Sequence, residues 1–132
     1  MSIATRYLLA WIPMVVIAVA NGVLRVVTYG RRMTELGAHQ LSTLIGAAAL
    51  SVYIGFVVRR WPPASGGEAL RLGAMWVALT VAFECLFGRF VVGRTWAQLL
   101  HDYDLSAGRV WVLLLIWVGA APWLFRKMRA HA

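Results

Sequence analysis

The sequence predicts an all-α fold: a four-helix transmembrane bundle with a short interfacial helix before the fourth span. Of its 132 residues, 61% are hydrophobic and 14% are charged, whereas a soluble domain is usually about 45–50% apolar and about 25% charged. The mean hydropathy is +0.73. Four spans of about 20 residues would occupy about 80 positions. We therefore expect a single integral membrane domain over residues 1–132, without room for a soluble catalytic domain.

Four apolar runs define the expected spans, at residues 7–28, 41–58, 70–92 and 107–125. The first two contain 18 uncharged residues each and the fourth contains 16, while Glu84 and Arg89 interrupt the third. Because lipid offers the backbone no hydrogen bonds, each run should be a helix. The first run also has a cleavage-like Ala18-Val19-Ala20 after Arg6. Its uncharged stretch exceeds a usual signal-peptide core, so we expect a retained span.

The helix boundaries have local causes in the sequence. Arg59-Arg60-Trp61-Pro62-Pro63 should end the second helix, because paired prolines cannot continue a hydrogen-bonded helix and Arg–Trp suits the interface. Ser65-Gly66-Gly67-Glu68 and Thr95-Trp96-Ala97-Gln98 both match a capping box. The first should start the third span, and the second should start the short interfacial helix.

The basic residues favour one orientation in the membrane. Four spans place both termini on one side, and the basic residues flanking that side are Arg6, Arg59, Arg60, Arg71, Arg126, Lys127 and Arg129. By the positive-inside rule we expect a multi-pass inner (plasma) membrane protein with both termini in the cytoplasm. A net charge of +8 would suggest nucleic acid in a soluble protein. Here it favours membrane lipids as partners, and we expect no nucleic-acid binding.

A weak internal repeat relates the two halves of the chain. Three residues recur at an offset of 64, namely Arg25, Leu41 and Ser42 at Arg89, Leu105 and Ser106. The repeat suggests two helical hairpins in parallel tandem. A chance match in so biased a composition is the alternative.

Polar residues within the expected spans gather in the outer half of the membrane. This intramembrane cluster contains Asn21, Arg25, Glu84, Arg89 and Arg109. A carboxylate in lipid requires a partner or a proton, so we expect Glu84 to pair with Arg25 or, as second choice, with Arg89. The cluster either lines a path for a solute or proton or only fixes helix register. The excess of arginine favours an anionic group in such a path.

Further polar residues should lie on the outer side, namely Gln40, Ser42, Thr43, His101, Asp102 and Asp104. His101 and Asp104 are metal-ligand types at i and i+3, but without a third ligand a solvated loop is favoured. His39 and His101 fall at the surface, whereas haem ligands lie at matching depth within helices. We expect neither a metal nor a cofactor.

A stripe of small residues at Ala47, Ser51 and Gly55 would allow close helix packing, within the chain or against another copy. The single cysteine, Cys85, excludes an intramolecular disulfide and is expected to be a packing residue. No nucleophile constellation can be assembled in the spans, so we do not expect an enzyme.

The chain contains segments such as Arg59-Arg60-Trp61-Pro62-Pro63 and Thr80-Val81-Ala82-Phe83-Glu84, on which a resemblance to one class of membrane protein is based. Over most of its length it resembles the small four-span inner-membrane proteins of bacteria that have no assigned activity. The resemblance includes no motif of known chemistry and transfers no site residues.

These observations favour an oligomeric transporter or channel-like protein for a small anionic or proton-coupled solute. A dimer is expected, because four helices enclose little space alone. The alternative is a non-catalytic accessory or assembly subunit of a larger membrane complex, or a protein that binds lipid headgroups. An enzyme acting on lipid ranks below both. A water-accessible cavity reaching Glu84 would favour transport, and a dry, fully paired Glu84 would favour an accessory role.

Overall fold

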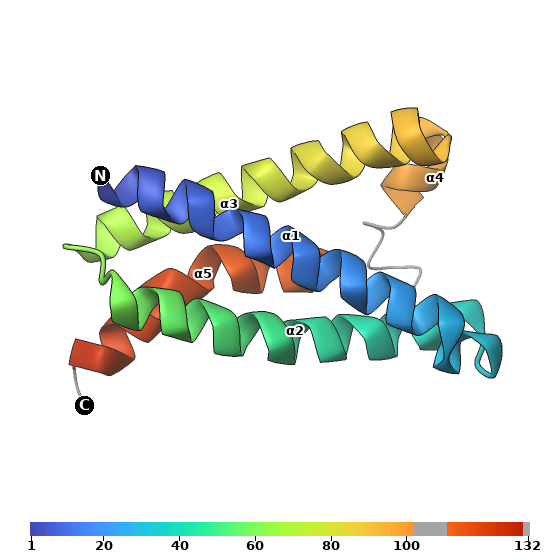
Figure 1. Ribbon diagram of the computed structural model, residues 1–132, viewed down its shortest axis with the longest axis horizontal. Coiled ribbons are helices and arrows are strands. Elements are labelled where there is room, and N and C mark those ends of the chain that lie inside the picture. Colours follow the sequence, from blue (N-terminus) through green and yellow to red (C-terminus); the bar gives the residue numbers. More distant parts are fainter. Residues whose placement is uncertain (102–110, 131–132) are drawn as a thin grey trace.

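The computed structural model describes residues 1–101 and 111–130, with side chains for 1–101 and 112–128 (Figure 1). Regular structure in these ranges is entirely helical, which confirms the predicted all-α class. In chain order the elements are α1 (Ile3–Val27), the 3-10 helix η1 (Tyr29–Arg31), α2 (Glu35–Arg60), α3 (Gly66–Phe87), the π-helix η2 (Gly88–Val92), α4 (Trp96–His101) and α5 (Trp111–Ala130).

Three helical segments are long and apolar enough to cross a membrane, namely Ile3–Val27, Glu35–Arg60 and Gly66–Val92. They overlap the first three expected spans. The expected fourth span, 107–125, begins outside the described residues, and α5 covers the remainder. The helices extend beyond the apolar runs because polar caps support their ends. Thr34 Oγ1, for example, accepts a hydrogen bond from the Gly37 N–H at 3.0 Å and starts α2 six residues before its apolar run.

One of the two predicted capping boxes is formed in full, and the other is formed in part. Thr95 Oγ1 accepts from the Gln98 N–H at 3.2 Å, and the Thr95 N–H donates to Gln98 Oε1 at 2.9 Å. This reciprocal pair starts α4, the short helix expected before the fourth span. At α3, Ser65 Oγ accepts from the Glu68 N–H at 3.1 Å, but Glu68 Oε1 reaches back one residue further, to the Ala64 N–H at 2.9 Å.

The long helices form two antiparallel hairpins, α1–α2 and α3–α5. Helices α1 and α3 run in one direction and α2 and α5 in the other, so α1 begins and α5 ends at the same end of the bundle (Figure 1). We call this the terminal end, and the opposite end, with η1 and α4, the distal end. This arrangement agrees with tandem hairpins, although two of the repeat positions, 105 and 106, lie outside the described residues.

Aromatic side chains hold the terminal half together. Tyr7 and Trp76 are fully buried, and their rings stack at 5.1 Å between centroids. Trp76 Nε1 donates to the Tyr7 carbonyl at 2.8 Å, and Tyr7 Oη donates to the Trp61 carbonyl at 2.8 Å. These hydrogen bonds join α1 to α3 and to the end of α2, and they satisfy polar groups that lipid would leave unpaired.

Helices α3 and α5 approach each other closely at Gly73 and Gly119. A Cβ atom on Gly73 would lie 1.9 Å from the Gly119 carbonyl oxygen, so only glycine fits there. The predicted stripe on α2 is used differently. Ala47 packs against the core and Ser51 Oγ accepts from Trp117 Nε1 at 2.7 Å, but a Cβ on Gly55 would meet nothing within 4 Å.

We predict that Gly73→Ala destabilises the protein by about 1–3 kcal/mol, because the added methyl group must push α3 and α5 apart. The matched control is Gly55→Ala, which places the same methyl group in open space and should stabilise α2 by roughly 0.5–1 kcal/mol. Denaturant unfolding of both variants in the same detergent measures the difference. Equal midpoints for the two variants would contradict the packing described at Gly73.

Candidate functional site

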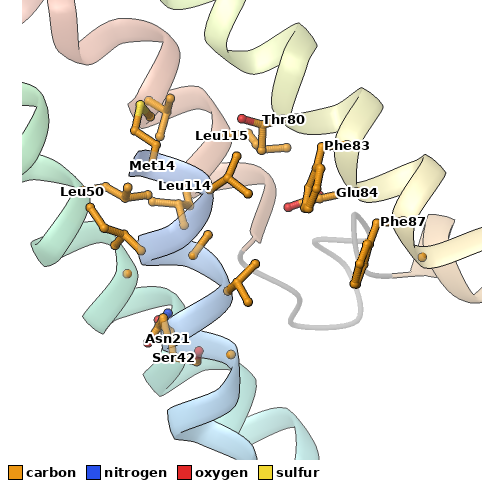
Figure 2. Close-up of a pocket in the computed structure, with 18 of the residues that line it drawn as sticks. Met14, Asn21, Ser42, Leu50, Thr80, Phe83, Glu84, Phe87, Leu114 and Leu115 are labelled. Atoms are coloured by element: carbon orange, nitrogen blue, oxygen red, sulfur yellow. The ribbon is translucent and has the colours of Figure 1, made fainter. Parts of the chain in front are cut away.

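A cavity of about 330 Å³ lies between α1 and α3 in the distal half of the bundle (Figure 2). Its volume is near the lower limit of small-molecule sites, about 300–1,000 Å³. The lining is mostly apolar, and α2 and α5 complete the walls, for example with Leu50 and Leu114. The polar groups among its lining residues are therefore few.

Trp11 and Thr80 are the lining residues of α1 and α3 that lie nearest the terminal end. Trp11 Nε1 donates to Thr80 Oγ1 at 3.1 Å, and the Trp11 ring meets Phe83 edge to face at 6.1 Å. Beyond this point towards the distal end, α1 and α3 diverge (Figure 1). The Trp11–Thr80 contact thus forms the floor of the cavity and separates it from the Tyr7–Trp76 core.

Glu84 points from α3 into the cavity (Figure 2). It is half-buried, and the two aromatic residues on either side of it, Phe83 and Phe87, stack with centroids 5.4 Å apart. Thr80, Phe83, Glu84 and Phe87 follow the i, i+3, i+4, i+7 spacing of one helix face. The predicted carboxylate therefore lies on a cavity wall that is otherwise aromatic.

Asn21 and Ser42 lie together on the opposite wall (Figure 2). Asn21 Nδ2 donates to the Ser42 carbonyl at 2.8 Å, which joins α1 to α2. Gly46 leaves room for this amide, because a Cβ there would lie 2.9 Å from Asn21 Nδ2. Asn21 Oδ1 is buried and has no hydrogen-bond partner among the atoms that the structure describes.

The arginines of the predicted cluster separate. Arg25 lines the cavity, as does Arg94, which the cluster did not include. The Arg89 guanidinium instead lies 5.6 Å from the Phe90 ring centroid, outside the lining. Arg89 lies in η2, and the residues of η2 that line the cavity are Gly88 and Val92. Arg109 lies outside the described residues.

Glu84 shares the cavity with Arg25, but the expected ion pair between them is not formed. Within the described part of the chain, no ion pair of 4.0 Å or less joins Glu84 to Arg25 or Arg89. Glu84 is nevertheless not free of interactions. The divergence of α1 and α3 explains the difference, since it places the cavity between Arg25 and the carboxylate.

The described residues expected on the outer side lie in different settings. Gln40 is exposed, and Thr43 Oγ1 donates within its own helix to the His39 carbonyl at 2.9 Å. His101 is exposed on α4, while Asp102 and Asp104 lie outside the described residues. In the ranges that the structure describes, no group of three His, Cys, Asp or Glu side chains is arranged to hold a metal ion.

Sequence reasoning missed the aromatic wall. Trp11, Phe83 and Phe87 contribute large rings to the cavity, and Thr80 contributes the hydroxyl at its floor. The signal was available in part, because the Thr80–Phe87 spacing marks a single face of α3 around Glu84. The contact with Trp11 spans 69 positions and depends on the tertiary fold.

Comparisons with protein-family models, with curated proteins and with solved structures found no match. The chemistry of the site itself therefore carries the functional argument.

We predict a measurable coupling between Trp11 and Thr80, because their hydrogen bond fixes α1 to α3 at the cavity floor. In a double-mutant cycle of Trp11→Phe and Thr80→Val, the coupling free energy should be about 0.6 kcal/mol and at most about 1.7 kcal/mol, as for other hydrogen bonds between membrane helices. Reversible unfolding of the two single variants and the double variant in detergent measures this term. Strictly additive changes in the free energy of unfolding would show that the Trp11–Thr80 hydrogen bond does not stabilise the protein.

Proposed function

We propose that this chain is a small polytopic inner-membrane transporter or channel-like protein, and that a small anionic or proton-coupled solute enters the cavity between α1 and α3. The supporting observation is that the cavity reaches Glu84. A carboxylate that lines a cavity at membrane depth can exchange a proton or cation there. A carboxylate buried among its own helices could only fix their register.

The chemistry of the walls supports an anionic or proton-coupled solute. The guanidinium groups of Arg25 and Arg94, two of the residues that line the cavity, would supply charge-assisted donors to such a solute. Glu84, on the aromatic wall, would take up or release a proton as the solute enters. Apolar surroundings strengthen each of these electrostatic interactions relative to water.

Movement through the membrane requires a second opening. The Tyr7–Trp76 core and the Trp11–Thr80 contact lie between the cavity and the terminal end. In our proposal these contacts are the gate, or the path continues between two copies of the chain in a dimer. The open seam between α1 and α3 gives the second copy access to the cavity.

We further propose that α5 is the fourth span and that the terminal end faces the cytoplasm. The support is the concentration of basic residues there, with Arg6, Arg60 and Lys127 beside interfacial tryptophans. The rule that positive residues remain inside gives this orientation.

A second candidate function is the binding of a lipid headgroup by an accessory subunit. The observation in its favour is the mostly apolar lining of the cavity next to Arg25 and Arg94, which would suit an acidic headgroup with part of its chain. Transport and lipid binding differ in whether solute crosses the membrane, so the two experiments below separate them.

We predict that water reaches the α1 wall of the cavity. In a Cys85→Ser background, Ala18→Cys places a thiol on a lining residue, and Ala20→Cys places one on the exposed face of the same helix, away from the cavity. A small charged thiol reagent should modify Ala18→Cys at least about tenfold faster, because thiols react as thiolates, which lipid disfavours. Rates can be followed by mass spectrometry in proteoliposomes. Equal rates would argue against a wet cavity.

We predict that Glu84→Gln abolishes proton entry into vesicles that contain the purified protein, because the amide cannot take up a proton. A pH-sensitive dye inside the vesicles reports the flux after a pH gradient is imposed. Glu68→Gln is the matched control, since Glu68 caps α3 outside the cavity and an amide also fits a capping box. Flux that persists in Glu84→Gln would remove this residue from the transport proposal. Flux lost equally in both variants would show a general defect.

A further inference from the structure

A second concave surface lies at the terminal end, on the face formed by α1 and α2. It is a groove of about 540 Å³, separate from the cavity near Glu84. Arg6, Arg60 and Trp61 line one part of it, and Leu9, Pro13 and Phe56 line another. We call it the terminal groove.

Two guanidinium groups share one indole ring in the terminal groove. The Cζ atoms of Arg6 and Arg60 lie 5.7 Å and 5.6 Å from the Trp61 ring centroid. Trp61 is itself fixed, because its carbonyl accepts from Tyr7 Oη at 2.8 Å and its N–H donates to the Val57 carbonyl at 2.9 Å. Both guanidinium groups therefore line the groove beside one ring whose backbone is fixed.

Neither Arg6 nor Arg60 forms an ion pair in the parts of the chain that the structure describes. Two like charges that line one groove repel each other, and an anion bound in that groove would be attracted by both. The guanidinium fork matches phosphate oxygens in a bidentate geometry.

The rest of the groove is apolar and extends along the helices. Leu9 is 48% exposed and Phe56 is 64% exposed. Pro13 lies seven residues after Arg6, which is about 10 Å further along α1. Tyr53 Oη donates to the Ala10 carbonyl at 2.7 Å and so holds α1 and α2 together beneath the groove. The surface thus changes from cationic to apolar over a distance that suits a headgroup followed by the start of an acyl chain.

We propose that the terminal groove binds one anionic phospholipid. The phosphate lies at Arg6 and Arg60, and one acyl chain follows Leu9, Pro13 and Phe56 towards the membrane centre. This site depends on insertion of the chain in a membrane, but not on the transport proposed for the cavity. Lipid bound there would fix the end of α2 to the start of α1 through Trp61.

The test compares phosphatidylglycerol with phosphatidylcholine of the same acyl chains, by native mass spectrometry of the purified full-length protein in detergent. The wild type should retain phosphatidylglycerol at least about tenfold more tightly. The double variant Arg6→Gln/Arg60→Gln should lose about thirtyfold in this affinity, from two interfacial arginines. Arg31→Gln/Arg32→Gln is the matched control, because it removes the same charge from exposed residues near the distal end.

Phosphatidylglycerol binding by the two double variants decides whether the terminal groove is the lipid site. Unchanged phosphatidylglycerol binding in Arg6→Gln/Arg60→Gln, with the thermal midpoint confirming a folded protein, overturns the proposal. An equal loss in the Arg31→Gln/Arg32→Gln control also overturns it, since attraction would then be a property of net charge.

Glycerol 1-phosphate, which has the headgroup phosphate without chains, should not displace the lipid at matched concentration. Displacement by it would overturn the assignment of a lipid. Phe56→Ala should weaken lipid retention and leave the preference for phosphatidylglycerol intact.

Discussion

The structure depends on one constraint, that a membrane offers no hydrogen bonds to the polar groups of helices inside it. In the terminal half, aromatic side chains meet this constraint by donating to carbonyls of neighbouring helices. Trp76 donates to Tyr7, Tyr7 to Trp61 and Tyr53 to Ala10. Each of these bonds fixes one helix to another while its ring fills the core. The residues that satisfy the polar groups are therefore also those that close this half of the bundle.

The distal half is held together differently, and this difference produces the cavity. In the terminal half, the close approach at Gly73 and Gly119 also brings α5 against α3, whereas the Trp11–Thr80 hydrogen bond is the last polar contact described between α1 and α3 towards the distal end. Beyond it the helices diverge, and side chains line a space instead of filling it. The bundle is thus closed by its aromatic donors at one end and opens where they stop. Glu84 lies on the open side of this boundary.

The sequence predicts the helices and their starts well because these depend on local patterns. The apolar runs, the prolines after Trp61 and the two capping boxes act over a few residues. The sequence also predicts that Asn21, Arg25 and Glu84 lie at similar depth, and all three line the cavity. It does not predict the distance between Arg25 and Glu84, since that depends on the crossing at Gly73 and on Trp11 meeting Thr80. Such contacts join residues far apart in the chain, and a single sequence does not specify them.

Arginines line both the cavity and the terminal groove. The two sites differ in whether an acidic side chain also lines them. Arg25 faces a cavity that also contains Glu84, so a proton on the carboxylate can alter the net charge of the site and hence its affinity for an anion. Arg6 and Arg60 lie around Trp61 with no ion-paired acid in the described residues, so their attraction for an anion is constant. A site of variable charge suits exchange of a solute, and a site of constant charge suits retention of a lipid. In our two proposals, the same guanidinium chemistry would therefore bind a transient ligand at one end and retain a lipid at the other.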